Sequence, residues 1–319
     1  MKIVIMGTGA MACLFGGRML QAGNEVWLVS GWKEQVEKIA TDGLTLSEKD
    51  HEDVILHPHV TLHPEDVIAN GAPYPDLVMI SSKGYQTSRT VKNALPLIGP
   101  ETRVLTLQNG MGNADAIAAY VPADRIFFGA ASVASDAPAI GHVKDTTNRN
   151  RSPLISIIPY NHVEDPFCGE LGKLFSSLGY STEASVAAER FVWKKLSVNC
   201  CGNAIAGISQ LANYIYSNDR DAFILMNQIC AEVCAVANAK GIFMDYEETR
   251  AYVHFTYYSQ HHYVSMCQDI HNKRPTEIDT INGYIVKEGK RLGIPTPVNE
   301  TLMHLVRLIS NHYADQWKG

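Results

Sequence analysis

The sequence lacks both a surplus of positive charge and a long apolar run. Its 27 Lys and Arg residues against 33 Asp and Glu residues give a formal net charge of −6, and no basic cluster is interleaved with aromatics, which argues against a nucleic-acid partner. No run of about 18 apolar residues is present, so we expect neither a transmembrane helix nor a membrane partner. The first apolar stretch is too short for a signal peptide, and we therefore expect a cytoplasmic protein.

Paired cysteine spacing is also missing. The seven cysteines show no zinc-type or disulfide-type spacing, which predicts buried reduced thiols. Cys230 and Cys234 lie one helical turn apart, a spacing more typical of core packing than of metal binding. His57, His59 and His63 lie in a proline-flanked segment that indicates an edge or irregular strand. No carboxylate or thiol completes a ligand set there, so no metal site is predicted.

What the chain does have is apolar sequence sufficient for packed cores. Its 319 residues are 46% hydrophobic, a length that suggests about two domains. Strand and helix patterns alternate over the first part, with further parallel strands expected at Leu77–Ile80 and Val104–Leu107, and the rest is almost wholly helical. We therefore predict an α/β fold: an N-terminal Rossmann dinucleotide-binding domain (1–183) followed by an all-helical C-terminal domain (184–319) that binds substrate.

The N-terminal segment has the strand–turn–helix–strand order of a dinucleotide-binding unit. A short apolar strand leads into Gly7-Thr8-Gly9-Ala10-Met11-Ala12, and then come a helix and a second apolar strand. Gly7 permits the tight turn, and Gly9 lets the backbone approach a pyrophosphate, whose charge the helix N-terminus favours. Ala12 replaces the third glycine, where helix and strand pack closely. This context favours cofactor binding over a purely structural glycine turn.

The end of the second strand indicates which cofactor is bound. NAD-binding proteins usually place an Asp or Glu there to hold the ribose hydroxyls, but this chain has Ser30-Gly31-Trp32-Lys33. Ser30 and Lys33 could accept a 2′-phosphate, which favours NADP (NADPH) over NAD. Glu34 weakens this argument, and Lys33 could be an ordinary surface lysine at the start of the next helix, so NAD stays open.

A long helical stretch over residues 191–208 presents Lys195, Asn199 and Asn203 at steps of four. Residues four apart lie on one face of a helix, so one ammonium and two carboxamides form a polar stripe on a mostly apolar helix. Such a stripe faces either solvent or a site. The apolar neighbours favour a site, and a solvated edge of a core helix is the alternative.

Three further motifs carry polar groups. Residues 107–112 read L-Q-N-G-M-G directly after a strand, and residues 81–83 read S-S-K at the end of the preceding strand. Carboxyl ends of parallel strands form one rim, where ligands bind in open α/β sheets, although Asn109-Gly110 could also be a simple turn. The third motif, over residues 265–283, places Glu277 in the first turn of a helix expected to run from Glu277 to Leu292. A merely dipole-stabilising acid is the alternative there.

Together these motifs resemble the 2-dehydropantoate 2-reductase (ketopantoate reductase) family. The resemblance rests on the glycine turn, L-Q-N-G-M-G, W-K-K-L-S-V-N-C-x-x-N, S-M-x-Q-D-I and T-E-I-D-x-I-N-G, in this order, and covers nearly the whole chain. It implies a Rossmann domain followed by a helical domain, and reduction of 2-dehydropantoate to (R)-pantoate by NADPH on the route to pantothenate. A homodimer through the helical domain would suit this fold.

The resemblance also implies residue roles. Lys195 matches the lysine that protonates the C2 oxygen, and Glu277 matches the carboxylate that hydrogen-bonds the substrate hydroxyl. Substrate-binding positions are matched by Asn199, Asn203, Ser265 and Asn109, the last also beside the cofactor, and Lys83 matches a lysine near the cofactor. Neutral amides can bind an anionic 2-oxo acid without quenching a cationic donor.

Two departures keep an alternative open. The arginine that family members often carry near the end of the second strand is absent. His262 stands three residues before Ser265, where the pantoate enzymes often have Asn, and H-H-Y-V-S-M-C-Q-D-I looks more like D-2-hydroxyacid dehydrogenases that reduce bulky or mandelate-type 2-oxo acids. Those relatives typically use NAD. His262 would then be a substrate-pocket residue. A non-catalytic dinucleotide sensor is less favoured, because a sensor needs neither Lys195 nor Glu277.

Overall fold

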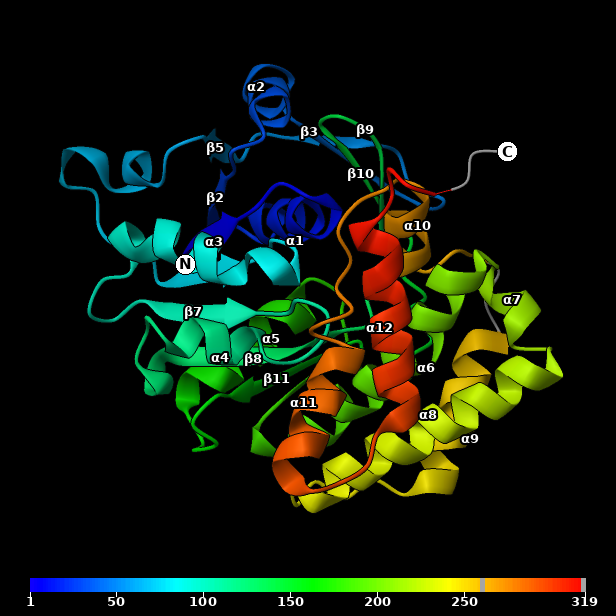
Figure 1. The fold of residues 1–319 in the computed structure, drawn as a ribbon. Coiled ribbons are helices and arrows are strands. Elements are labelled where there is room, and N and C mark those ends of the chain that lie inside the picture. Colours follow the sequence, from blue (N-terminus) through cyan, green and yellow to red (C-terminus); the bar gives the residue numbers. More distant parts are fainter. Residues whose placement is uncertain (259–261, 317–319) are drawn as a thin grey trace. The chain divides into compact units, whose positions relative to one another are not determined.

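The computed structural model describes residues 1–258 and 262–316, and the chain divides into two compact units (Figure 1). Unit 1 comprises residues 1–108 and 113–189, and unit 2 comprises residues 109–112 and 190–319. The short segment 109–112 therefore groups with the helices, although the residues on both sides of it belong to unit 1. The predicted domain boundary after residue 183 falls within strand β12 (Thr182–Ala184) and stays a prediction.

Unit 1 is built on a mainly parallel sheet with the strand order β12-β11-β8-β7-β6-β1-β2-β5. The six neighbouring strands β5-β2-β1-β6-β7-β8 all run parallel. This is the 3-2-1-4-5-6 arrangement of the doubly wound dinucleotide fold. Strand β11 runs antiparallel to β8. The predicted Rossmann-type fold is thus confirmed. Its other strands are β1 (Lys2–Met6), β2 (Glu25–Val29), β5 (His59–Thr61), β6 (Leu77–Ile80), β7 (Arg103–Thr106), β8 (Ile126–Ala131) and β11 (Ile155–Pro159).

A second, four-stranded sheet belongs to the same unit, in the order β4-β3-β10-β9. Its strands are β3 (Leu44–Glu48), β4 (Val54–Leu56), β9 (Ser135–Ala139) and β10 (His142–Asp145). A hairpin with its turn at Gly141, which has φ +74°, joins β9 to β10, and β3 and β4 were not predicted from the sequence. Parallel pairing of β3 with β10 joins segments about a hundred residues apart, and this sheet was missed.

Helix α1 (Ala10–Gln21) packs between the two sheets, and two glycines in its middle make that possible. A Cβ on Gly16 would lie 2.8 Å from Leu28 of the large sheet. A Cβ on Gly17 would lie 3.2 Å from Leu56 of the small sheet. Glycine normally weakens a helix interior, so here it is explained by close approach on both faces of α1.

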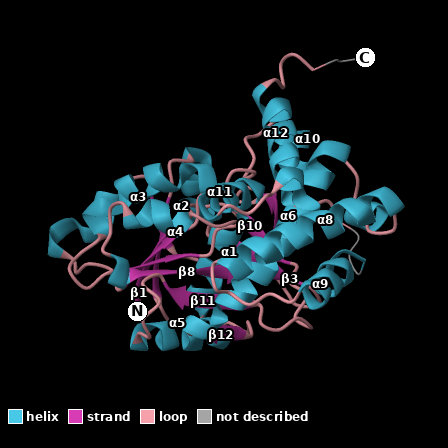
Figure 2. Cartoon of the chain, turned by 60° about the horizontal axis from the view of Figure 1, so that its bottom comes forward, coloured by secondary structure: helices cyan, strands magenta, loops and turns pink. Residues whose placement is uncertain are grey.

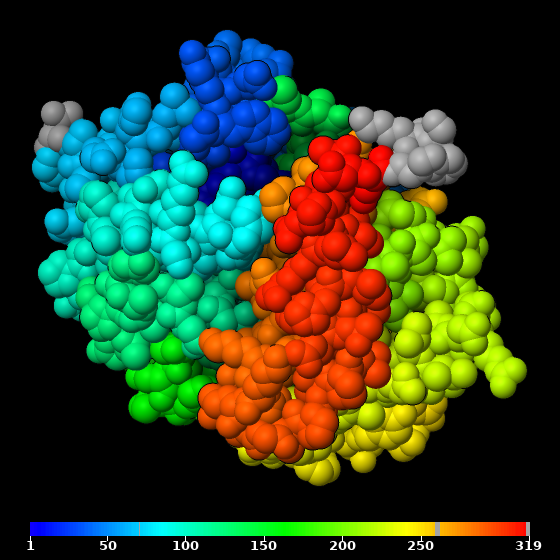
Figure 3. Space-filling model, in the orientation of Figure 1, coloured from blue at the N-terminus to red at the C-terminus, as the bar shows by residue number. Residues whose placement is uncertain are grey.

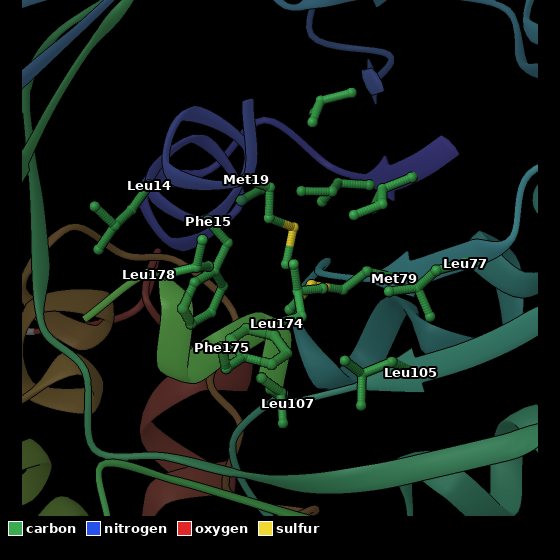
Figure 4. Close-up of a cluster of buried hydrophobic side chains, with 14 of the residues drawn as sticks. Leu14, Phe15, Met19, Leu77, Met79, Leu105, Leu107, Leu174, Phe175 and Leu178 are labelled. Atoms are coloured by element: carbon green, nitrogen blue, oxygen red, sulfur yellow. The ribbon is translucent and has the colours of Figure 1, made fainter. Parts of the chain in front are cut away.

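The core of unit 1 lies around α1 and α5 (Pro166–Ser177) (Figure 4). The ring of Phe15 meets the rings of Phe175 and Tyr180 edge-on, at centroid distances of 5.4 and 5.9 Å, a favoured aromatic geometry. Asp165 caps α5 by accepting a hydrogen bond from the Phe167 amide at 2.8 Å. In Figure 2, α3 (Thr87–Ala94) and α4 (Asn113–Ala118) lie on one side of the strands and α5 on the other. Helix α2 (Lys33–Asp42) follows β2.

A charged cluster ties α1 to the small sheet. Arg18 bonds Glu48 and Asp145 at 2.5 and 3.2 Å, and Arg149 bonds the same two carboxylates, each at 2.9 Å. Burial raises the pKa of Asp145, but hydrogen bonds from Thr147 and the nearby arginines outweigh burial and hold this pKa below its usual value. The Asp145 side chain is therefore a buried, ionised link between β10 and α1.

Unit 2 is helical in its described part. Its helices are α6 (Glu189–Ser209), α7 (Asn213–Tyr216), α8 (Arg220–Ala239), α9 (Tyr246–Tyr258), α10 (Ser265–His271), α11 (Asn282–Leu292) and α12 (Pro297–Asn311). Helix α6 is buried along most of its length, and its glycines admit neighbours: a Cβ on Gly202 would collide with Tyr257 of α9, and one on Gly207 with Ile270 of α10. Close packing around α6 is thus specified locally by glycine.

By length and composition alone, helix α8 is long and apolar enough to cross a membrane. The sequence analysis did not expect such a helix, because the chain has no unbroken apolar run. Core helices often pass this test, so the signal is weak evidence. Here Met226, Ile229 and Val233 are buried within unit 2, and the Glu232 carboxylate accepts hydrogen bonds from the backbone amides of Val298 and Asn299 at the start of α12. Helix α12 itself (red in Figure 3) lies at the surface.

All seven cysteines are buried free thiols, as expected. No group of three or more His, Cys, Asp or Glu side chains is arranged to hold a metal ion within residues 1–258 and 262–316. His59 lies on the edge strand β5, where its ring stacks on Trp27 at 4.5 Å. Packing therefore accounts for this histidine.

Candidate functional site

The carboxyl edge of the large sheet gathers the predicted cofactor residues of unit 1. The Gly7 amide bonds the Val29 carbonyl at 2.7 Å, and the Ser81 amide bonds the Met6 carbonyl at 3.1 Å. Because β1 pairs with both β2 and β6, the glycine turn lies between the segment after β2, with Ser30, and the segment after β6, with Lys83. The parallel register places these segments along one edge.

The glycine turn has the shape that a dinucleotide needs. Gly7 has φ +139°, and a Cβ there would lie 3.0 Å from the Ser81 carbonyl oxygen, so a side chain is excluded. Gly9 has open space where its Cβ would be, and it caps α1 with no side-chain hydrogen bond. Both features suit a pyrophosphate approaching the N-terminal amides of α1. Ala10 and Met11 are partly exposed in the first turn of α1, whereas Ala12 is buried.

Thr8, between these glycines, is 3% exposed, and its hydroxyl has no hydrogen-bond partner within residues 1–258 and 262–316. Buried hydroxyls are normally satisfied, so this orphan fits a turn that binds a polar ligand. The Thr8 carbonyl, in contrast, accepts hydrogen bonds from Gln35 at 3.2 Å and from the Cys13 thiol at 3.3 Å. Burial raises the pKa of Cys13 to about 11, with the Gln35 hydrogen bond acting against it, so the thiol stays a donor.

Gln35 also links the turn to the small sheet, because its carbonyl oxygen accepts a hydrogen bond from the Gly141 amide at 2.9 Å. A cavity of about 250 Å³ adjoins these groups, lined by Thr8, Cys13, Trp32 and Gln35 and by residues of the β9–β10 hairpin. No sequence signal pointed to Gln35, because its role depends on a hairpin a hundred residues away.

The residues proposed to select the cofactor lie directly after β2. Ser30 is partly exposed, and its hydroxyl accepts a hydrogen bond from the Trp32 amide at 3.2 Å. Lys33 is exposed at the start of α2 and lies 3.5 Å from Glu37. Solvent-exposed ion pairs of this kind contribute little, so the pair leaves Lys33 able to turn toward an anion. Glu37 is the partner in the structure, rather than the Glu34 that the sequence suggested as a competitor.

Gln108 is the hub of a polar network at the ends of β6 and β7. Its amide nitrogen donates to the Ser82 carbonyl at 2.6 Å and lies 3.0 Å from the Thr87 hydroxyl, and its oxygen accepts from Thr106 at 2.8 Å. The network fixes the segment that carries Lys83. The sequence placed Gln108 within L-Q-N-G but assigned it no role.

The polar stripe of unit 2 lies on a buried helix. Asn199 and Asn203 are 7% and 4% exposed, and Lys195, one turn earlier on α6, is partly buried. A solvated edge is therefore excluded for the two carboxamides. Cys200 and Cys201 beside them are fully buried; burial raises the pKa of the Cys200 thiol well above its usual value, which keeps it protonated and unreactive.

Glu277 is 7% exposed, but it does not lie in a helix. The helix expected from Glu277 starts five residues later, at Asn282. Residues 277–281 form a turn instead, in which the Thr280 and Ile281 amides both reach the Glu277 carbonyl at 3.2 Å, and Ile281 has φ −102° and ψ −97°, which interrupts the helical path. The dipole explanation of this acid is therefore wrong, because Glu277 is not in a first helical turn.

Hydrogen bonds on two sides link this turn to other parts of the site. Asn282 is fully buried and donates to the Cys200 carbonyl of α6 at 3.1 Å and to Asn299 of α12 at 2.9 Å. On the other side, the Met111 amide donates to the Thr280 carbonyl at 2.7 Å, which joins the segment that contains Asn109 to the same turn. The structure thus brings Asn109, the Glu277 turn and α6 into one unit.

Ser265 begins α10, next to α6, and is exposed. His262, also exposed, precedes it and is held by Asn213. The Asn213 oxygen accepts the His262 backbone amide at 3.0 Å, and the Asn213 nitrogen lies 3.2 Å from Nδ1 of the imidazole. The first bond identifies the amide oxygen, so it is the amide nitrogen of Asn213 that faces Nδ1 of the ring.

Comparison with known proteins covers both units. A family model described as "Ketopantoate reductase PanE/ApbA" matches residues 3–151, and one described as "Ketopantoate reductase PanE/ApbA C terminal" matches residues 188–310. The 2-dehydropantoate 2-reductase of Lactococcus lactis subsp. lactis (strain IL1403) is 30% identical over 312 residues, which cover 96% of this chain and 97% of that protein. The chain belongs to the ketopantoate reductase family. The resemblance inferred from its motifs is confirmed.

Two solved structures show how far the ketopantoate reductase fold is shared. A ternary structure of D-mandelate dehydrogenase with NADH and anilino(oxo)acetate is 28% identical, covers 99% of this chain and 100% of its own, and superposes with a TM-score of 0.89. A PanE/ApbA family ketopantoate reductase from Ralstonia eutropha JMP134 is 30% identical, covers 98% and 99%, and gives a TM-score of 0.83. Structures similar to this chain thus include both a D-mandelate dehydrogenase and a ketopantoate reductase, the two kinds of enzyme that the sequence analysis considered.

Family membership supports an oxidoreductase of the 2-dehydropantoate 2-reductase type, whereas the individual residue roles remain proposals. Five residues hydrogen-bond to segments that carry proposed site residues, but the sequence analysis gave them no role. They are Gln35, Gln108, Asn213, Thr280 and Asn282. Gln108, Thr280 and Asn282 lie within the quoted motifs, but the motifs alone do not show which groups these side chains contact.

Proposed function

We propose that this protein reduces 2-dehydropantoate to (R)-pantoate with NADPH, as an enzyme of pantothenate biosynthesis. The observation that carries the proposal is the buried stripe of α6, with Lys195, Asn199 and Asn203, tied through Asn282 to the turn of Glu277. A dinucleotide sensor has no need for a buried amide stripe and a buried carboxylate in a second unit. Relatives named 2-dehydropantoate 2-reductase match this chain over 96% of its length.

The chemistry needs a proton, an orienting acceptor and a carboxylate site. A nicotinamide dinucleotide supplies the hydride when bound. The Lys195 ammonium donates a proton to the C2 oxygen as charge develops there, and the Glu277 carboxylate accepts a hydrogen bond from the resulting hydroxyl and so orients it. Asn199 and Asn203 bind the neutral polar groups of the substrate, and Ser265 binds its carboxylate. The low exposure of the amides limits water around the developing charge.

The segment after β2 supports NADPH. An acid that would repel a 2′-phosphate is missing at the strand end, and Ser30 and Lys33 offer a hydroxyl and an ammonium there. The glycine turn, with Gly7, Gly9 and the unsatisfied Thr8 hydroxyl, suits the pyrophosphate of either cofactor. Lys83 and Asn109 complete the proposed cofactor contacts. The D-mandelate dehydrogenase relatives are named with NADH, and NADH is therefore the competing cofactor.

A second candidate function is reduction of bulky, aromatic 2-oxo acids to D-2-hydroxy acids. It is favoured by His262, which Asn213 holds through two contacts, and by the TM-score of 0.89 with D-mandelate dehydrogenase. An imidazole ring offers a flat face, which suits an aromatic substrate better than a branched aliphatic one. Substrate preference separates the two functions.

The role of Lys195 is tested by Lys195→Ala with a matched control on the same helix. Lys194 is the adjacent lysine, and its ammonium pairs with Glu248. We expect Lys195→Ala to lower kcat at least about 100-fold while cofactor affinity is kept, because only the proton donor is lost. Lys194→Ala should change kcat by less than about threefold, since an exposed ion pair contributes little.

Undiminished turnover in Lys195→Ala would overturn the proposed acid role. Equal losses in both variants would indicate damage to α6 rather than loss of a catalytic group. A wild-type protein that binds cofactor but reduces neither class of 2-oxo acid would support the sensor instead.

A further inference from the structure

The segment Asn109–Gly112 and the turn Glu277–Ile281 are locked together within unit 2. The Met111 amide donates to the Thr280 carbonyl at 2.7 Å. The Thr280 hydroxyl reaches back to the Asn109 carbonyl at 3.4 Å and to the carbonyl of Glu277 at 3.1 Å. One threonine thus touches the main chains of two residues that the proposed mechanism uses.

Glycine at position 110 makes this contact sterically possible. Gly110 has φ +81°, and a Cβ there would lie 2.2 Å from the Thr280 carbonyl oxygen and 2.7 Å from its hydroxyl. The first contact is with backbone and the second with a side chain, and both are shorter than a real Cβ tolerates. Gly110 is therefore needed for the close approach of Thr280 as well as for the turn. A simple Asn-Gly turn alone does not explain the glycine at this position.

The threonine hydroxyl has one proton and two acceptors. The proton is shared by, or alternates between, the carbonyls of Asn109 and Glu277. The hydroxyl therefore links both main chains to one side chain. Thr280 is partly buried, which shields these bonds from water. Because Glu277 precedes a break in the helical path at Ile281, the position of its carboxylate depends on contacts of this turn rather than on a continuous helix.

We propose that Thr280 is a positioning residue for the reaction, which sets the Asn109 segment and the Glu277 carboxylate in a fixed relation. This inference rests on the proposed function. It also explains why Asn109–Gly112 groups with the helical unit, apart from the strand that precedes it.

Thr280→Val removes the hydroxyl and keeps the shape, whereas Thr280→Ser keeps the hydroxyl. We expect Thr280→Val to lower kcat about fivefold or more, the effect of about one hydrogen bond. Thr280→Ser should restore kcat to within about twofold. Thr301→Val is the matched control, because Thr301 on α12 makes the same kind of bond, to the Pro297 carbonyl at 2.8 Å, and should leave kcat unchanged.

A double-mutant cycle with Glu277→Gln distinguishes positioning from general structural support. If Thr280 acts through the carboxylate, Thr280→Val should cost less than about twofold in the Glu277→Gln background. Additive losses would overturn the positioning role. So would wild-type kcat in Thr280→Val.

Gly110→Ala provides a readout that needs no turnover. The added methyl group should push the segment away from Thr280, and hydrogen exchange of the Met111 amide should become at least about tenfold faster. Unchanged exchange would show that the two segments are not locked. Failure of the proposed function would look different: the wild type would reduce no 2-oxo acid at all while Met111 stayed protected, and the catalytic inference would fall with it.

Discussion

Asn282 makes the sharpest prediction about what holds the site together. It starts α11 and is fully buried, and its amide donates to the carbonyl of Cys200 on α6 and to the side-chain oxygen of Asn299. Asn299 in turn bonds Glu232 at 2.7 Å. Replacing Asn282 by Ala removes a donor that joins three helices of unit 2.

The magnitude follows from the two acceptors left behind. Losing the bond to the Cys200 carbonyl should cost about 1 kcal/mol, because this carbonyl still accepts a hydrogen bond within its own helix. Losing the bond to Asn299 should cost about 2 kcal/mol, since that oxygen is fully buried. The oxygen of Asn282 has no partner among the described residues, so its removal offsets a small part. We expect a loss of about 2–3 kcal/mol.

Urea and thermal unfolding of Asn282→Ala test this figure. A loss of 2–3 kcal/mol corresponds to a fall in Tm of roughly 3–5 °C for a chain of 319 residues, because the entropy of unfolding grows with chain length. Asn218→Ala is the matched control: Asn218 is exposed and donates to the Tyr214 carbonyl at 2.6 Å, and it should cost less than about 0.5 kcal/mol. An Asn282→Ala variant within 1 kcal/mol of this control would refute the reasoning that buried amides hold α6 to the Glu277 turn.

Two further predictions concern charge. Lys33→Ala should raise the KM of NADPH about fivefold or more and leave that of NADH unchanged, because only NADPH carries the 2′-phosphate; equal effects on both cofactors would remove Lys33 from the phosphate site. The pKa of Asp145 is held below its usual value, so its contribution to stability is complete above about pH 4 and is lost as the pH falls through the folded-state pKa. Asp145→Asn should therefore cost about 3 kcal/mol at pH 7 and flatten the acid limb of stability against pH; an unchanged acid limb in urea melts would contradict this.

Local patterns sufficed for the central strands and failed for pairings between distant segments. The strands β1, β2 and β6 could be recognised from their apolar runs, because strands buried on both faces read as continuous apolar stretches. The small sheet was missed, since its pairing of β3 with β10 joins segments about a hundred residues apart. The start of α11 was wrong because helical spacing continues through Glu277, whereas the backbone turns there to receive residues 109–112.

Much of the candidate site could be predicted where chemistry-bearing residues share one element. Lys195, Asn199 and Asn203 follow from helical periodicity alone, and their place on a buried helix is observed. The residues that hold the site, such as Asn282 and Thr280, could not be assigned, because their partners lie about 80 and 170 residues away. Which oxygen an amide meets is a property of the tertiary fold and leaves no periodic trace in the sequence.

The central claim is tested most directly by a steady-state assay that crosses two cofactors with two substrates. Oxidation of NADPH and of NADH is followed by absorbance, each with 2-dehydropantoate and with phenylglyoxylate. We expect kcat/KM to be highest for NADPH with 2-dehydropantoate. A higher kcat/KM for phenylglyoxylate, with either cofactor, would contradict the account and assign the chain to the D-2-hydroxyacid dehydrogenases.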